Sequence, residues 1–198
     1  MVHAARGRFT EGREHYAQVN TRIHMMMMQH SVLMQLDRRD RALFVRCVDH
    51  SRRRRGWTVA WTLFTHLGGA TASVIAVLIP LLFFDGLLHA AARQALAALV
   101  MSHFGVQLVK RTVSRPRPAR VVGWDALINE PDRFSFPSGH SAAAMAVAFS
   151  FALAFPVAAG PLLALAVIVG ASRVFLGVHY PGDVIVGQSI AIATALLI

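Results

Sequence analysis

The sequence predicts an all-α fold, an integral membrane helical bundle with about five transmembrane helices behind an arginine-rich, amphipathic N-terminal segment. Two observations favour this class: 55% of the 198 residues are hydrophobic, and the 65 residues from Phe134 to Ile198 contain only Arg173 and Asp183 as charged side chains. A chain this short cannot build a soluble core large enough to bury such a stretch. A lipid environment can accommodate it.

The N-terminal region, residues 1–56, carries twelve of the 20 Lys and Arg residues of a chain whose net charge is +10. Apolar residues recur among these arginines at near-helical intervals, which predicts an amphipathic helix on an anionic membrane surface. We therefore divide the chain into a basic surface segment, 1–56, and a membrane-embedded domain, 57–198. The apolar positions are Val32, Leu33, Leu36, Leu43, Phe44 and Val48.

Five apolar stretches follow, and each is expected to form one membrane helix. Asp85-Gly86 predicts a tight turn between the first and second stretches, and Phe155-Pro156 with Gly160-Pro161 predicts another between the third and fourth. The stretches are Leu67–Phe84, Leu87–Val109, Ser141–Phe155, Pro161–Ser172 with an extension to Val178, and Asp183–Ile198.

The longest internal polar region, Lys110–Phe136, contains six Lys and Arg residues. Lys110 is followed seven residues later by Arg117-Pro118. A lysine supplies a point charge and an arginine a planar pair of donors, a combination that suits the oxygens of one phosphate group. The alternative is a basic flank that holds a helix end at the cytoplasmic surface.

The segment Pro137-Ser138-Gly139-His140-Ser141 comes directly before an apolar stretch. Its proline and glycine predict a bend before a helix whose first N–H groups point outward and can bind phosphate oxygens. Ser138 adds a hydroxyl, and His140 could give a proton to a departing oxygen. The alternative is a plain helix cap with a histidine at the membrane interface.

The third cluster runs from Ser172-Arg173 to His179-Tyr180-Pro181-Gly182-Asp183. Pro181 suits the first turn of a helix, so Asp183 would lie in that turn and could reach back to His179. A carboxylate on one ring nitrogen leaves the other free to act as a nucleophile. The alternative is an ion pair between Arg173 and Asp183 that ties two helices together.

Together the three clusters resemble the signature of the type 2 phosphatidic acid phosphatase family, which is itself similar to the vanadium haloperoxidases. The resemblance implies a metal-independent phosphatase without a cofactor. In it, His179 attacks phosphorus, Asp183 orients His179, and His140 protonates the leaving group. It further implies that the phosphate group is bound by Lys110, Arg117, Ser138, Gly139 and Arg173.

Other functions have weaker support in the sequence. His89 and His103 could bind haem in a membrane electron carrier, but this leaves the three clusters unexplained. The arginine run Arg52–Arg55 could bind nucleic acid, yet beside a membrane segment it favours anionic lipids. Copper at His24, Met25–Met28 and His30 is chemically possible. A zinc ion at His140, His179 and Asp183 would be opposed by the nearby cations.

We therefore expect a lipid phosphate substrate: phosphatidate, phosphatidylglycerol phosphate or a polyprenyl diphosphate. The expected partners are this lipid and, through the basic N-terminal segment, anionic membrane lipids, with no nucleic acid. Nineteen of the 20 Lys and Arg residues would share one side of the membrane if there are five spans, and Arg93 alone would lie on the other. The positive-inside rule then predicts that the site faces the cytoplasm from the cell (inner) membrane.

Overall fold

The computed structural model describes residues 34–49, 55–119, 126–128 and 132–198. Contacts divide the chain into two units, Met1–Arg41 and Ala42–Ile198. In the first unit the described residues are helical, with an ion pair between Asp37 and Arg41 (2.6 Å). The fold and the site described below belong to the second unit. Most of the predicted N-terminal segment lies outside the described residues.

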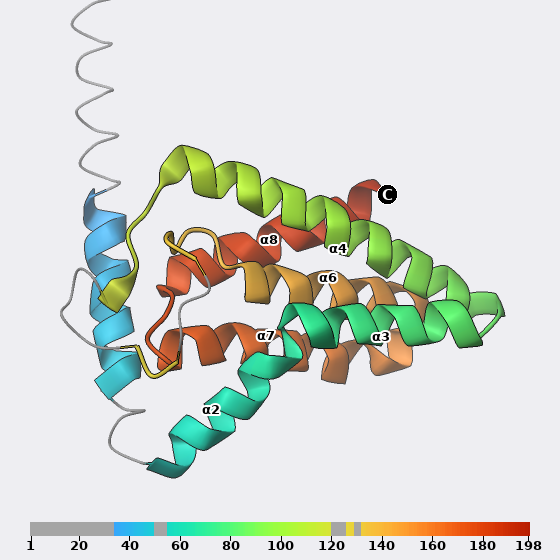
Figure 1. The fold of residues 1–198 in the computed structure, drawn as a ribbon, viewed down its shortest axis with the longest axis horizontal. Coiled ribbons are helices and arrows are strands. Elements are labelled where there is room, and N and C mark those ends of the chain that lie inside the picture. The colour runs from blue at the N-terminus through green and yellow to red at the C-terminus, as the bar shows by residue number, and fades with distance from the viewer. Residues whose placement is uncertain (1–33, 50–54, 120–125, 129–131) are drawn as a thin grey trace, which may run out of the picture. The chain divides into compact units, whose positions relative to one another are not determined.

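The second unit is helical, as predicted, and among its described residues the only β-pairing is an isolated bridge between Pro116 and Phe134. Each of the five predicted apolar stretches lies largely within one helix (Figure 1). In chain order these helices are α3 (Ala70–Phe83), α4 (Gly86–Val113), α6 (Gly139–Ala154), α7 (Ala159–Phe175) and α8 (Pro181–Leu197), with a short 3₁₀ turn at Pro156–Ala158 before α7.

A further helix, α2 (Arg55–Leu67), precedes α3, and the sequence analysis did not predict it. Within the described residues, Pro156–Phe175 is long and apolar enough to cross a membrane alone. The pair Gly56–Leu67 and Ala70–Phe83 would make a second span if its 47° bend lies within one crossing. Helices α6 and α8 are apolar but shorter, so the count of five spans stays a prediction.

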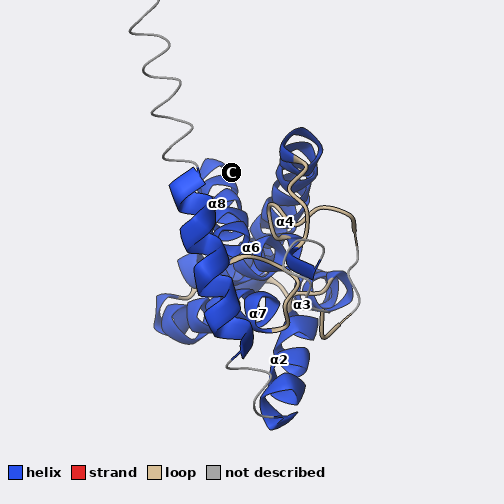
Figure 2. Ribbon diagram, turned by 90° about the vertical axis from the view of Figure 1, so that its left-hand side faces the viewer, coloured by secondary structure: helices blue, strands red, loops and turns tan. Residues whose placement is uncertain are grey.

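Helix α6 lies at the centre of the bundle and packs against α4, α7 and α8 (Figures 1 and 2). The packed surfaces are built mainly from alanine, which lets helix backbones approach closely. The buried cluster between these helices contains Ala98, Val106, Ala142, Met145, Ala146, Ala148, Ala166, Ala191 and Ala195.

Residues 42–49 are also helical, but this part of the helix that was predicted to lie on the membrane surface packs against protein. Phe44 and Val48 are each only 1% exposed, because they pack against Val174, Tyr180 and Val184 at the junction of α7 and α8. The rings of Phe44 and Tyr180 meet edge to face with their centroids 5.2 Å apart. These two apolar positions therefore face protein rather than lipid, whereas Leu43 remains half exposed.

Candidate active site

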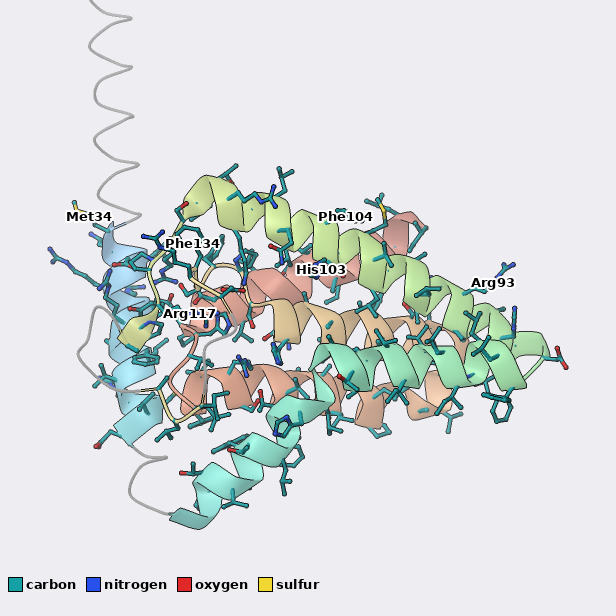
Figure 3. The ribbon with its side chains drawn as sticks, viewed as in Figure 1. Met34, Arg93, His103, Phe104, Arg117 and Phe134 are labelled. Carbon is teal, nitrogen blue, oxygen red and sulfur yellow. The ribbon has the colours of Figure 1, made fainter. Side chains whose placement is uncertain are left out.

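The three sequence clusters meet at the end of the bundle where α4 and α7 end and α6 and α8 begin. Figure 3 places Arg117 at this end, whereas Arg93 lies near the opposite end, by the turn between α3 and α4. Six of the predicted site residues are buried: Lys110, Arg117, Ser138, Arg173, His179 and Asp183. Gly139 and His140 are partly buried in the first turn of α6.

A tight turn after α4 brings Arg117 back toward the bundle. Ser114 adopts the left-handed conformation (φ 49°), and its N–H donates to the carbonyl of Lys110 (3.1 Å). The chain then runs beside residues 134–135, where the Ser135 N–H donates to the Arg115 carbonyl (2.9 Å). This turn allows Lys110 on α4 and Arg117 beyond it to serve the same site.

Arg117 is completely buried, and its guanidinium is held from several directions. Nη1 donates to the Val178 carbonyl (2.8 Å) and lies 3.5 Å from Nε2 of His179. Nε donates to the carbonyl of Asp132 (2.8 Å), and Nη2 donates to Oδ1 of the same residue (2.7 Å). The other carboxylate oxygen of Asp132 accepts from Nζ of Lys110. Lys110 and Arg117 are thus joined through one carboxylate.

The turn before α6 is fixed to the start of α8. Ser138 caps α6 by accepting from the Ser141 hydroxyl (2.8 Å) and N–H (3.5 Å). Its own N–H donates to the carbonyl of Asp183 (2.9 Å). Gly187 permits this approach, since a Cβ there would lie 2.5 Å from the Ser138 carbonyl oxygen. The outward N–H groups that begin α6 therefore lie beside the first turn of α8.

A second tight turn brings His179 next to Arg173. Gly177 has φ 82°, a left-handed conformation that glycine adopts readily. The N–H groups of Val178 and His179 both donate to the Arg173 carbonyl (3.1 and 3.2 Å). Pro181 then begins α8, as predicted, and places Asp183 in its first turn.

His179 and Asp183 face each other, with 3.5 Å between Nδ1 and Oδ2, at the outer limit of a hydrogen bond. Nδ1 has no closer partner among the described residues, and Nε2 lies toward Arg117. Burial lowers the pKa of His179 to about 4, although the contact with Asp183 opposes this shift. The imidazole is therefore neutral near pH 7, with an available lone pair.

Asp183 is completely buried and has three partners. Oδ2 also accepts from the Tyr180 N–H (2.9 Å), while Oδ1 accepts from Nη1 of Arg115 (2.7 Å). The Arg115 guanidinium lies over the Tyr180 ring, 4.0 Å from its centroid. Asp183 thus forms an ion pair with Arg115. The alternative interpretation of the sequence placed Arg173 in that position.

Arg173 is 1% exposed and only partly satisfied. Nη1 donates to the hydroxyl of Thr65 on α2 (2.6 Å). Nε and Nη2 are buried without a hydrogen-bond partner among the described residues. The charges of Arg173, Lys110 and Arg117 all act on His140. A buried guanidinium with two unused donors in a cluster of cations is the arrangement expected of an anion site.

Three residues of this site were not predicted: Thr65, Arg115 and Asp132. Arg115 belongs to the repeated Arg-Pro pair in Arg115-Pro116-Arg117-Pro118, a signal that could have drawn attention to it. Thr65 and Asp132 carry no local motif. Their roles arise from contacts that span 108 residues, to Arg173, and 15 and 22 residues, to Arg117 and Lys110.

A cavity of about 460 Å³ opens from this cluster between α3, α4 and α6. At one end it is lined by Lys110, Asp132 and His140. His103 and Gln107 on α4 add polar groups, and the rest is mainly apolar, including Val74, Leu96, Leu99, Val100 and Phe104. The cavity therefore joins the end lined by Lys110, Asp132 and His140 to a mainly apolar space.

The two histidines proposed as haem ligands lie far apart on α4. His89 and His103 lie 14 positions apart on α4, about 21 Å along a helix that rises ~1.5 Å per residue. One iron could not bind both. Within the described residues, no group of three or more His, Cys, Asp and Glu side chains is placed to hold a metal ion. The predicted copper ligands lie outside the described part.

The chain is similar to known proteins both in sequence and in fold. Residues 91–198 match the family model of the PAP2 superfamily. The chain is 36% identical over 104 residues to a lipid A 1-phosphatase of Rhizobium johnstonii, covering 50% of this chain and 43% of the relative. It is also 36% identical over 109 residues to a decaprenylphosphoryl-5-phosphoribose phosphatase of Mycobacterium tuberculosis, covering 52% and 56%. The chain spans about half the length of these curated relatives.

Two solved structures have a similar fold at 25% sequence identity. Aquifex aeolicus LpxE superposes with a TM-score of 0.68, over 79% of this chain and 92% of the other. A transmembrane PAP2-type phosphatidylglycerolphosphate phosphatase of Bacillus subtilis gives 0.65, over 82% and 83%. The similarity in fold thus covers about four fifths of this chain.

Proposed function

Because the chain belongs to the PAP2 superfamily, we propose that it is a membrane-bound lipid phosphatase acting through a phosphohistidine, without a metal. The observation that carries this proposal is Arg173, whose buried Nε and Nη2 have no partner among the described residues. A phosphate group would satisfy both donors. Leaving a charged donor buried and unpaired is costly, so the fold must gain by binding an anion there.

In the first step of the proposed reaction, Nε2 of His179 attacks phosphorus. The Nδ1–H points toward Asp183, which fixes the ring and stabilises the positive charge that develops on it. The bond between phosphorus and the leaving oxygen breaks, and His140 gives that oxygen a proton. The negative charges of the bound phosphate group attract a proton to His140, which favours the protonated form that this step requires.

In the second step, water attacks the phosphohistidine and His140 takes the proton of that water. The N–P bond breaks, inorganic phosphate leaves, and His179 returns to its neutral form. Lys110, Arg117 and Arg173, with Ser138 and the N–H of Gly139, would stabilise the phosphoryl oxygens throughout. Phosphoryl transfer depends mainly on such positioning and charge neutralisation, which these fixed side chains supply in place of a metal.

We infer that the substrate carries its phosphate on a lipid. The cavity beyond Lys110 and His140 is walled by apolar residues of α3 and α4, so it suits a hydrocarbon chain. The two curated relatives are named for lipid A and for a decaprenyl-linked phosphate. The candidate substrates are phosphatidate, phosphatidylglycerol phosphate and polyprenyl diphosphate. We add the two lipid classes of these relatives to them.

The direct test is phosphate release by the purified protein in detergent, against a panel of these lipids, with EDTA present throughout. We expect release from at least one lipid, no loss with EDTA, and no release by His179→Ala. The matched control is His89→Ala, which removes a histidine far along α4 from the site. Activity that is lost with EDTA and restored by magnesium or zinc would contradict the metal-free mechanism.

The protein is a membrane protein, and we propose five crossings, with α2 and α3 sharing one and α4, α6, α7 and α8 making the others. Large apolar side chains on the outside of α3 and α4 support this, because Leu82, Phe83, Phe104 and Leu108 are all more than 60% exposed. With this count, the distribution of Lys and Arg supports a site that faces the cytoplasm.

A further inference from the structure

We propose that Asp132 is a positioning residue that occupies the phosphate-binding cations while the site is empty and gives them up when phosphate binds. This inference rests on the proposed function. It adds a residue outside the three sequence clusters and gives that residue a definite effect: its carboxylate competes with substrate and with product phosphate for Lys110 and Arg117.

The Asp132 carboxylate makes the contacts that a bound phosphate group would make. One carboxylate oxygen accepts from Nη2 of Arg117 (2.7 Å), and the other accepts from Nζ of Lys110. Lys110 and Arg117 are the two cations from α4 and the turn after it that were predicted to bind phosphate. Two oxygens of one acidic group, each bonded to a different cation, reproduce the way in which a phosphate would bridge them.

The Asp132 side chain is also placed so that it can turn away from Lys110 and Arg117. Its side chain is 39% exposed, whereas Arg117 is completely buried and Lys110 only 7% exposed in its side chain. The cations therefore stay in place while the carboxylate can turn toward solvent. Burial alone would raise the pKa of Asp132, but the hydrogen bonds and charges of Lys110 and Arg117 outweigh it and hold that pKa below its usual value. Asp132 is thus an anion near pH 7.

Asp132 and a bound phosphate cannot both use these donors. Both are anions, and two anions sharing the same two cations would repel each other at short range. Asp132 lines the cavity together with Lys110 and His140, so an entering phosphate group must displace its side chain. The same carboxylate can return to the cations as product phosphate departs, which shortens the time that phosphate stays bound.

Two hydrogen bonds of Arg117 do not depend on the Asp132 side chain. Nε donates to the main-chain carbonyl of Asp132 (2.8 Å), and Nη1 donates to the Val178 carbonyl (2.8 Å). Asp132→Asn leaves both bonds possible, so it removes the competing charge without removing the support of Arg117. This separates competition from simple structural support.

The experiment measures binding of orthovanadate and of inorganic phosphate to the purified protein, by titration calorimetry and by inhibition of phosphate release. In Asp132→Asn we expect both ligands to bind about tenfold more tightly, the order of effect of removing one charge-assisted competitor. Asp132→Glu, which keeps the charge, should bind like the wild type. Asp85→Asn, which removes a charge in the turn between α3 and α4, should also leave binding unchanged.

The outcomes are distinct. Equal or weaker binding by a folded Asp132→Asn protein would overturn the inference alone, because a purely supporting carboxylate lowers affinity when it is lost. If Asp132→Asn does not fold, Asp132→Ser provides the same comparison, and failure of both to fold would show a structural tie and overturn the inference. Absence of both vanadate binding and phosphate release in the wild type would overturn the proposed function as well.

Discussion

Replacing Thr65 with valine removes the hydroxyl that accepts from Nη1 of Arg173 (2.6 Å) while keeping nearly the same side-chain volume. Thr65 is 3% exposed and lies on α2, before the part of the chain that matches the superfamily model. A buried hydrogen bond to a charged group contributes about 1.5–3 kcal/mol. If that energy holds Arg173 against the phosphoryl group in the transition state, kcat/KM should fall by about 10- to 150-fold.

The assay is steady-state phosphate release from the best lipid found for the wild type, together with the thermal unfolding midpoint in the same detergent. Thr65→Ser keeps the hydroxyl and should restore most of the activity. Thr62→Val is the matched control, since the Thr62 hydroxyl donates to the Thr58 carbonyl within α2 and does not contact the site. A Thr65→Val protein with wild-type kcat/KM would refute the argument that Thr65 positions Arg173.

Four further predictions follow from the site. His140→Ala should slow turnover by about 10² to 10⁴, the usual contribution of a general acid, as measured by kcat. Burial lowers the pKa of His179 to about 4, below its ordinary value, so the unfolded chain binds this proton more readily. The unfolding midpoint should therefore fall as the pH drops from about 6.5 toward 4, and His179→Gln should reduce that fall. Gly187→Ala would place a Cβ 2.5 Å from the Ser138 carbonyl oxygen, so it should cost about 1–3 kcal/mol of stability in denaturant unfolding and lower kcat/KM. A cysteine at the exposed position Thr112, in a Cys47→Ser background, should react with a membrane-impermeant maleimide only after the cells are opened; labelling in intact cells would contradict a cytoplasmic site.

The sequence was most informative where the relevant residues are close along the chain. Pro181 predicted that a helix begins after His179 with Asp183 in its first turn, and Pro181 does begin that helix. The helix predicted after Pro137 is likewise present, and Ser138 caps it from the position directly before it, as the alternative interpretation of that segment stated. Such local geometry follows from helix periodicity alone, so the sequence sufficed.

The sequence was least informative where a contact depends on how helices pack. Thr65 and Arg173 are 108 residues apart and meet only because α2 packs against α7. Helix α2 itself was missed, since its threonines and His66 interrupt the apolar pattern on which the spans were predicted. Phe44 and Val48 fit an amphipathic pattern that does not distinguish a lipid surface from a protein surface. The predicted roles of the site residues stay predictions until the variants are measured.

The edge-to-face contact between Phe44 and Tyr180 determines where a shortened version of this protein should begin. A chain shortened at the hydropathy boundary, to begin at Trp57, would lack Phe44 and Val48 and would expose Tyr180, whose N–H bonds to Asp183. A chain that begins at Ala42 would retain this support behind the His179 turn. Fusion tags and proteolytic sites therefore belong before residue 42, where the first compact unit ends.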